Sequence, residues 1–208
     1  MRVTKKPEIR RKELMNAAED LFIEKGYEQV EVSEIAKKVG VVKGTFYYYF
    51  KSKEAILDAI IDKYISILVE DMENMVNQKD LTALEKLMNI YPFALSFPGG
   101  HKSIMHHLQE EKNVHLSMKL EQRIPQETAG LLTRIIKQGI EEGVFNIKYP
   151  EEAAGVYMGT MIILQGIENL DPNSLEFKRK FMAIFYFIER ILGAEEGLII
   201  KFMEKNSS

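Results

Sequence analysis

Apolar residues recur with the spacing of an α-helix along almost the whole chain, and this period constrains the fold more than any other feature. A clear stripe ends before Gly26 and consists of Leu14, Ala17, Ala18, Leu21 and Phe22. No segment shows the apolar and polar alternation of a β-strand, and no internal repeat is found. The sequence therefore predicts an all-α fold.

Glycine, proline and N-cap residues divide the chain into further helices. A long helix is expected after Ser52, and the run of residues 97–100 should break the chain sharply. Other helices are expected at residues 32–39, at 43–50, near Leu81 to Tyr91, from about His101, from Pro125 in a first turn to about Gly143, from Pro150 to about Asn169, from Ser174 to Leu192, and from Leu198 to Met203.

The composition, with 46% hydrophobic and 28% charged residues, is that of a globular protein. The absence of cysteine excludes disulfides, thiolate nucleophiles and cysteine zinc sites. The longest uncharged stretch, Ala153 to Ile167, is 15 residues, shorter than the ~20 that a membrane-spanning helix needs. The start of the chain lacks the apolar core of a signal peptide. We expect a cytoplasmic protein that does not enter a membrane.

Charge is distributed unevenly along the chain. Residues 1–53 carry 12 Lys or Arg against 8 Asp or Glu, whereas the remaining residues carry 16 against 23. A small basic segment joined to a larger acidic one is compatible with a nucleic-acid-binding module attached to another module.

The stretch from Val32 to Phe50 has the features of a helix-turn-helix. Two short amphipathic helices flank Gly40, a residue that can adopt the left-handed conformation that ends a helix and reverses its direction. Ala36 is small where the second helix must cross the first closely. The spacing therefore predicts a helix-turn-helix.

The second of these helices has an unusual outer face. With Phe46 pointing inward, Phe50 and Tyr49 lie near the buried side. The residues that then face outward, next to Lys43, are Gly44, Thr45, Tyr47 and Tyr48. Phenols and hydroxyls at this position suit a surface that contacts DNA phosphates and bases. Packing of the tyrosines on another helix of the chain is the alternative.

Residues from about Arg10 to Asp58 resemble the DNA-binding domain of TetR-family (AcrR-like) transcriptional regulators. The matching words are Ala17-Ala18, Leu21-Phe22, Lys25-Gly26-Tyr27, Ile35-Ala36, Val39-Gly40-Val41, Lys43-Gly44-Thr45-Phe46-Tyr47-Tyr48-Tyr49-Phe50 and Ser52-Lys53-Glu54. They cover about a quarter of the chain in one ordered run, so the match is more specific than any single short motif.

The resemblance implies a homodimeric repressor that binds double-stranded operator DNA and leaves it when a small-molecule effector binds. The chain would then divide into a helix-turn-helix domain at residues 1–52 and an effector-binding and dimerisation domain at residues 53–208, joined by the long helix. By position, the DNA-binding candidates are Lys43, Gly44, Thr45, Tyr47, Tyr48, Tyr49 and Lys53.

Two residues depart from the family pattern. Val30 and Val42 stand where the family usually has Thr and Ser, at the positions that start the two helices of the motif. Because valine cannot cap a helix, each substitution is expected to cost on the order of 1 kcal/mol. Val42→Ser should therefore stabilise the second helix and strengthen operator binding.

Beyond the first domain, the resemblance gives architecture without a guide to individual residues. The resemblance implies a four-helix dimer seam made from the last two long helices. Small residues on one helix face and an aromatic stripe on the next would build it, with packing inside one chain as the alternative. The dimer-interface candidates are Gly155, Gly159, Phe177, Phe181, Phe185 and Ile188.

An effector pocket is expected between helices of this domain, lined by apolar and aromatic groups. The candidates for lining it are Tyr91, Phe93, Phe97, Met105, Met118, Tyr157 and Met161. Filling of the core is the alternative role for the methionines. A hydrophobic or amphipathic effector is expected, whereas a buried carboxylate such as Glu110 or Glu127 would favour a cation.

Other functional classes receive less support. No two of His101, His106, His107 and His115 have the spacing of three or four residues that places two metal ligands on one helix face. A phosphate loop, a nucleophile elbow and a HExxH motif are absent, so we expect no enzyme, no metal and no cofactor. A TetR-like module controlled by a protein partner, or acting without a ligand, is the second candidate function.

Overall fold

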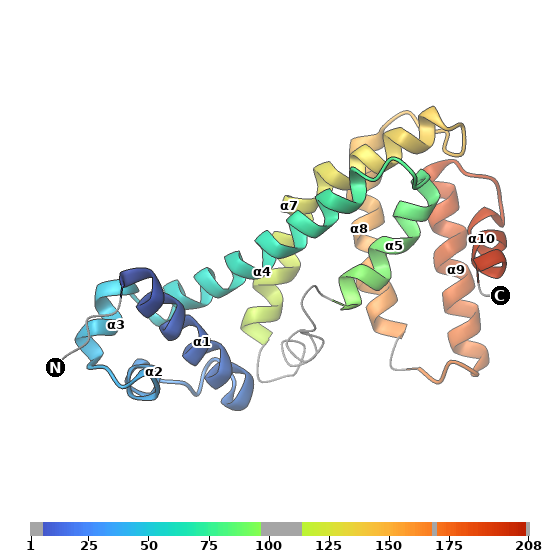
Figure 1. Ribbon diagram of the computed structural model, residues 1–208. Coiled ribbons are helices and arrows are strands. Elements are labelled where there is room, and N and C mark those ends of the chain that lie inside the picture. Colours follow the sequence, from blue (N-terminus) through green and yellow to red (C-terminus); the bar gives the residue numbers. More distant parts are fainter. Residues whose placement is uncertain (1–5, 97–113, 168–169, 207–208) are drawn as a thin grey trace. The chain divides into compact units, whose positions relative to one another are not determined.

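A computed structural model describes residues 6–96, 114–167 and 170–206. Within these ranges every regular element is a helix, as predicted (Figure 1). The helices are α1 (Pro7–Lys25), α2 (Val32–Val39), α3 (Lys43–Tyr49), α4 (Lys53–Val76), α5 (Ala83–Ser96), α7 (Val114–Glu141), α8 (Pro150–Ile167), α9 (Leu175–Leu192) and α10 (Leu198–Asn206).

Most helix ends follow the capping signals in the sequence. The hydroxyl of Ser52 accepts a 3.0 Å hydrogen bond from the N–H of Ala55, and the hydroxyl of Ser174 accepts one of 3.0 Å from Phe177. Gly193 ends α9 in the left-handed conformation, with φ 59° and ψ 31°. The expected bounds of α4 at its start, and of α9, are therefore confirmed.

One predicted boundary is wrong. Pro125 lies inside α7, which begins at Val114, rather than in the first turn of a helix. An internal proline removes one backbone hydrogen bond and disfavours a helix, but it does not forbid one. The preceding turns carry Lys119 and Arg123, both of which form ion pairs with α4. The helix expected from about His101 falls largely outside the described residues.

The chain forms two compact units. Met1–Leu68 and Leu95–Ile124 belong to the first, and Val69–Ala94 and Pro125–Ser208 belong to the second. In the first unit α1 packs on α2, and α2 packs on α3. The most deeply buried side chains of this core are Leu14, Phe22, Ile35, Phe46, Ile56, Leu57 and Ile61.

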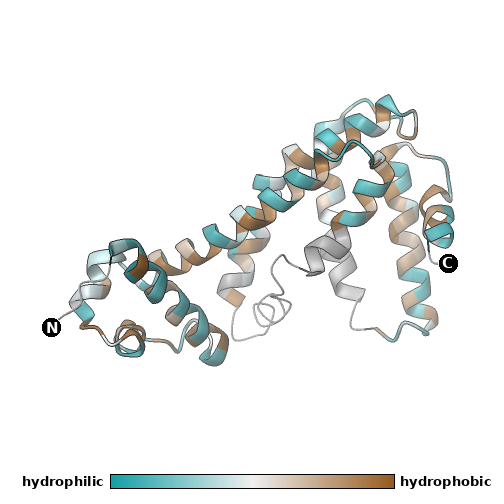
Figure 2. Cartoon of the chain, in the orientation of Figure 1, coloured by the Kyte–Doolittle hydropathy of each residue, from teal (hydrophilic) through white to brown (hydrophobic). Residues whose placement is uncertain are grey.

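In the second unit α8 packs against α9, and α10 packs against α9. The buried carboxylate of Glu189 accepts two 2.8 Å hydrogen bonds, from the N–H groups of Gly197 and Ile199, and so caps the start of α10. Figure 2 shows apolar and polar residues alternating along α9, as expected for a helix with one buried face.

A buried lysine is fully hydrogen-bonded in the second unit. The Nζ of Lys86 donates to the carbonyl of Val76 and to Oε1 of Gln138, both at 2.8 Å. The amide of Gln138 donates in turn to Glu142, which also accepts from the N–H of Ala83. This network satisfies the last carbonyl of α4 and the first N–H of α5.

Alanine substitution at two glycines of α7 should change the free energy of unfolding in opposite directions. A Cβ atom at Gly139 would overlap the ring of Phe145, whereas a Cβ at Gly130 would meet open space. Gly139→Ala should therefore lower the free energy of unfolding by about 1–3 kcal/mol. Gly130→Ala should raise it by up to about 1 kcal/mol, because alanine favours the helix. Urea unfolding followed by circular dichroism measures both, and equal effects would contradict the packing at Phe145.

Candidate nucleic-acid interface

A fixed turn at Gly40 orients the two helices of the motif. Gly40 has φ 73° and ψ 34°, in the left-handed region where side chains are disfavoured. Its N–H donates to the carbonyl of Lys37 at 3.0 Å, and the N–H of Val41 donates to Ala36 at 2.9 Å. These two bonds form a Schellman motif. The turn therefore ends α2 and directs the chain into α3, as the sequence predicts.

The two faces of α3 are sharply different. Phe46 and Phe50 are buried, with ring centroids 5.9 Å apart, and the guanidinium of Arg11 lies 5.0 Å from the centroid of Phe50. On the opposite face Tyr47 is 48% exposed and Tyr48 is 77% exposed. The predicted facing of α3 is confirmed, and within the described ranges both tyrosines remain exposed.

The remaining residues of the outer face complete a polar surface. The Nζ of Lys43 lies 5.9 Å from the ring centroid of Tyr47. A Cβ at Gly44 would meet no atom within 4 Å, so the backbone is open there. Tyr49 is half-buried and meets the ring of Tyr48 edge-on, with centroids 4.9 Å apart. A ligand approaching α3 would meet phenols, a cation and bare backbone.

Lys53 is engaged within the first unit. Its Nζ donates to the carbonyls of Tyr27 and Glu28, at 2.8 and 3.2 Å. It also lies 4.4 Å from the centroid of the Tyr27 ring. Lys53 thus ties the start of α4 to the turn between α1 and α2.

The starts of the two motif helices differ from each other. Val42 is the N-cap of α3, as expected, and it makes no side-chain cap bond, which costs on the order of 1 kcal/mol. Val30 is not a cap residue, so that expectation is wrong. It is buried, and α2 is capped instead by Glu31.

Glu34 supports the start of α2. Its carboxylate accepts the N–H of Glu31 at 3.0 Å and forms an ion pair of 2.6 Å with Lys25. The backbone hydrogen bond, together with Lys25, lowers the pKa of Glu34. A valine at position 30 is tolerated because another residue supplies the cap.

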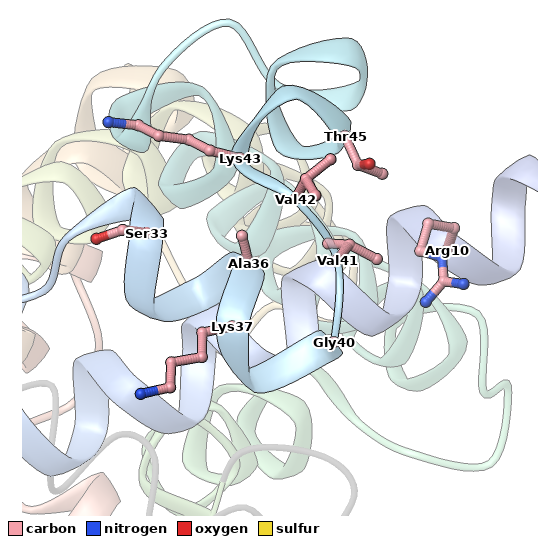
Figure 3. Close-up of a pocket in the computed structure, with 9 residues that line it drawn as sticks. All are labelled: Arg10, Ser33, Ala36, Lys37, Gly40, Val41, Val42, Lys43 and Thr45. Carbon is pink, nitrogen blue, oxygen red and sulfur yellow. The ribbon is translucent and has the colours of Figure 1, made fainter.

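A shallow hollow of about 620 Å³ lies between α1, α2 and α3 (Figure 3). The residues that line it are Arg10, Ser33, Ala36, Lys37, Gly40, Val41, Val42, Lys43 and Thr45. Three of these residues are cationic, and an alanine and two valines form an apolar part of the lining. The ammonium groups of Lys37 and Lys43 point away from these apolar side chains (Figure 3). The guanidinium of Arg10 also pairs with Glu13 at 2.7 Å. Lys43 and Thr45 link this hollow to the outer face of α3.

Arg10, Ser33 and Lys37 were not among the residues singled out from the sequence. They come from exposed or half-exposed positions of α1 and α2, where a polar residue carries no special signal. The packing of α1 on α2 and of α2 on α3 brings them to one hollow. A helical-wheel projection of α1 and α2, combined with the geometry of the turn at Gly40, could have identified these three residues.

Polar contacts hold the first part of α4 on two sides within the first unit. The hydroxyl of Tyr64 donates to the carboxylate of Glu19 in α1, and Nζ of Lys63 lies 3.2 Å from the same carboxylate. Burial and the neighbouring Glu19 raise the pKa of the Tyr64 phenol, so it remains a donor at neutral pH.

On its other side α4 carries a row of acidic residues that pairs with α7. Lys119 lies 2.8 Å from Glu54 and 2.7 Å from Asp58, and Arg123 lies 2.7 Å from Asp62. Burial alone would lower the pKa of Lys119, but the hydrogen bonds to Asp58 and Glu54 raise it overall. We call these five residues the α4–α7 ion ladder.

The profile of a family described as bacterial regulatory proteins, TetR family, matches residues 14–60. The fatty acid metabolism regulator protein of Bacillus subtilis (strain 168) is 34% identical over 134 residues, which are 63% of this chain and 68% of that protein. The chain belongs to the TetR family. Its helix-turn-helix is therefore that of a DNA-binding transcriptional regulator.

Two further proteins illustrate the similarity. The HTH-type transcriptional repressor KstR2 of Mycobacterium tuberculosis (strain ATCC 25618 / H37Rv) is 29% identical over 150 residues, 69% of this TetR-family chain and 73% of that repressor. The crystal structure of the transcriptional regulator FadR from Bacillus subtilis in complex with stearoyl-CoA matches with a TM-score of 0.59 and 26% identity, over 85% of this chain and 97% of that one.

Of the seven residues suggested for an effector pocket, the structure describes the side chains of two, Tyr157 and Met118. Tyr157 is buried, and its hydroxyl donates to the carbonyl of Leu87 at 3.2 Å. Met118 is exposed on α7. Phe97 and Met105 lie outside the described residues, and so do the side chains of Tyr91, Phe93 and Met161.

The residues suggested for a dimer interface fall into two groups. Gly155 and Gly159 lie on an exposed face of α8, and a Cβ on either would meet no atom within 4 Å. Phe177 and Phe181 are partly exposed and stack with centroids 5.5 Å apart. Phe185 and Ile188 are buried inside the chain.

Two expected absences concern metals and membranes. Among the described residues no group of three or more His, Asp or Glu could hold a metal ion. His101, His106 and His107 lie outside those residues, as does the side chain of His115. Of the helices in the described ranges, none has the length and apolarity required to span a membrane.

Proposed function

We propose that this TetR-family regulator is a homodimeric repressor that acts on the bacterial chromosome in the cytoplasm and leaves its operator when an acyl-CoA binds. Residues 1–52 form the DNA-binding domain, and residues 53–208 form the effector-binding and dimerisation domain. The observation that carries the proposal is the outer face of α3, where Tyr47 and Tyr48 are exposed beside Lys43 and the open backbone of Gly44.

In this proposal α3 lies in the major groove of operator DNA. The phenols of Tyr47 and Tyr48 donate hydrogen bonds to phosphates or contact base edges, and Lys43 and Thr45 add a charge and a hydroxyl. Tyr49 contributes its exposed edge and orients the ring of Tyr48. Lys53 acts indirectly, because its ammonium group holds the turn between α1 and α2.

Replacing the two exposed tyrosines tests the reading surface. Tyr47→Ala/Tyr48→Ala should weaken binding to an operator by about tenfold or more, since each lost contact is worth about 1–3 kcal/mol. Fluorescence anisotropy with DNA flanking the gene, at several salt concentrations, measures the loss. Tyr149→Ala is the matched control, because Tyr149 is an exposed tyrosine of the second unit. Equal affinities of the double variant and the control would contradict the assignment.

A second copy of the chain is proposed to pack on the exposed faces of α8 and α9. Gly155, Val156 and Gly159 share one exposed face of α8, and Met182 and Tyr186 are exposed on α9. Small residues allow close helix approach, and the apolar neighbours supply buried area. Phe177 and Phe181 flank this surface, whereas Phe185 and Ile188 support it from inside the chain.

A bulky residue at Gly159 should prevent this packing. Gly159→Leu is expected to give a light-scattering mass near 24.0 kDa, that of one chain, whereas the unaltered protein should give about twice that mass. Gly130→Leu is the control, since Gly130 is an equally open helix position on α7. A Gly159→Leu protein that remains dimeric, with unchanged helical circular dichroism, would rule out this seam.

The effector class is proposed from the relatives. The Bacillus subtilis FadR structure contains stearoyl-CoA, and the fatty acid metabolism regulator protein of Bacillus subtilis is 34% identical over 63% of this chain. An acyl-CoA is also the amphipathic type of molecule that the sequence predicts. Binding would move α4, which the ion ladder and Glu19 tie to α7 and to α1 within the first unit. Displacing α4 would change the position of α3 and release the operator.

Titration with stearoyl-CoA tests this coupling. Stearoyl-CoA should release operator DNA in an anisotropy assay, whereas coenzyme A without the acyl chain should not. Because coupling is reciprocal, saturating operator should weaken stearoyl-CoA binding by the same factor, measured by calorimetry. Equal affinity for stearoyl-CoA with and without operator would contradict the mechanism. If acyl-CoAs have no effect while DNA still binds, control by a protein partner becomes the better function.

A further inference from the structure

Neither helix capping nor core packing explains the exposed valine at position 42. It is the N-cap residue of α3, where its side chain accepts no hydrogen bond, and it is 65% exposed. An apolar side chain in this place neither caps the helix nor fills the core. We infer that Val42 is a specificity-determining residue that recognises the 5-methyl group of a thymine in the operator. The inference rests on the proposed operator binding.

The surroundings of Val42 are suited to contact with the phosphates and bases of one DNA strand. Val42 lines the hollow between α1, α2 and α3 together with Val41 and Ala36 (Figure 3). Arg10 on α1 and Lys43 on α3 also line the hollow, and the ammonium group of Lys43 is directed away from Val42. Phosphates would be attracted to these cations, which would leave the valine methyl groups to meet an apolar group of the DNA.

The thymine methyl group is the apolar group that the major groove offers. Every other major-groove position of the four base pairs presents a hydrogen-bond donor or acceptor, or the hydrogen of cytosine C5. Valine has no donor or acceptor in its side chain, so it gains by burying a methyl group and leaves polar base atoms without a partner. Residues at the start of a recognition helix are those that contact base edges in helix-turn-helix proteins.

In this inference the residues next to Val42 make the polar contacts to the operator, and Val42 makes the apolar one. Thr45 lies one turn further along α3 and also lines the hollow, and Tyr48 is exposed on the next turn. Their hydroxyl groups serve polar base atoms or phosphates. Val42 is therefore expected to define one base pair in each half-site. On this inference Val42→Ser gains a helix cap but loses the methyl contact, so the stronger binding expected from the sequence would not apply to an operator that carries this thymine.

Replacing thymine by uracil removes only the methyl group and so tests the contact directly. An operator is first enriched from a random duplex library with the full-length protein, and each thymine is then changed singly to uracil. At one thymine per half-site, uracil should weaken binding by about fourfold, the value expected for one buried methyl group. In Val42→Ala the same change should have less than about half of that effect on affinity.

Two further variants keep the test decisive. Val42→Thr retains one methyl group and should give an intermediate sensitivity to uracil, and it serves if the alanine variant folds poorly. Val114→Ala removes another exposed valine, 53% exposed on α7, and should retain full sensitivity. The ratio of thymine to uracil affinities is unaffected by changes in helix stability that alter both affinities equally.

The possible failures separate the two proposals. If the protein binds an enriched operator but no thymine is sensitive to uracil, or if Val42→Ala is as sensitive as the unaltered protein, the role of Val42 is refuted while operator binding stands. If no duplex is enriched and none binds, operator binding itself is refuted, and the role of Val42 with it.

Discussion

The left-handed turn at Gly40 is the constraint on which the DNA-binding part of this protein depends. Two backbone hydrogen bonds from Gly40 and Val41 close the end of α2, and the small Ala36 lets α3 approach. A side chain at position 40 would meet no neighbouring atom, so the cost of replacing this glycine would lie in the backbone conformation. The direction of α3, and with it every residue of the outer face, follows from this one turn.

A short helix can present such a surface only because its other face is firmly anchored. With seven residues α3 is too short to be stable alone. Phe46 and Phe50 bury it in the first unit, and Arg11 stacks over Phe50 from α1. This anchoring offsets the missing cap at Val42 and the flexibility introduced by Gly44. The outer face is thereby free to be shaped by its ligand rather than by stability.

The sequence predicts the fold well where local signals act alone. Periodic apolar residues, Ser52, Ser174 and the helix-ending glycines locate most helices, and the two faces of α3 follow from helical geometry. Prediction from the sequence fails where a contact between residues far apart in the chain determines the structure. Lys119 and Arg123 extend α7 toward its start through pairs with α4, and Glu31 with Glu34 replaces the cap expected at Val30.

The candidate site likewise contains some residues that local sequence signals predict and others that only the packing of the helices brings together. Tyr47 and Tyr48 are predicted from one helix, whereas Arg10 and Lys37 join the hollow only through the packing of three helices. Lys53 illustrates the limit for long side chains. Its position at the start of α4 suits a phosphate contact, yet its ammonium group reaches two carbonyls of the α1–α2 turn. A sequence motif places the Cα of a lysine but does not fix where four methylene groups direct its charge.

The glycines of α8 lower the stability of that helix, and packing between two chains would compensate for this cost. Gly155 and Gly159 each disfavour a helix by about 1 kcal/mol relative to alanine, and nothing within the described chain uses the space they leave. The opposite face of α8 is well packed, with Ala154 and Tyr157 fully buried, so the helix is not weak throughout. A cost confined to the outer face is offset only if another surface approaches the backbone there. The exposed Met182 and Tyr186 of α9 provide the apolar area that such an approach would bury.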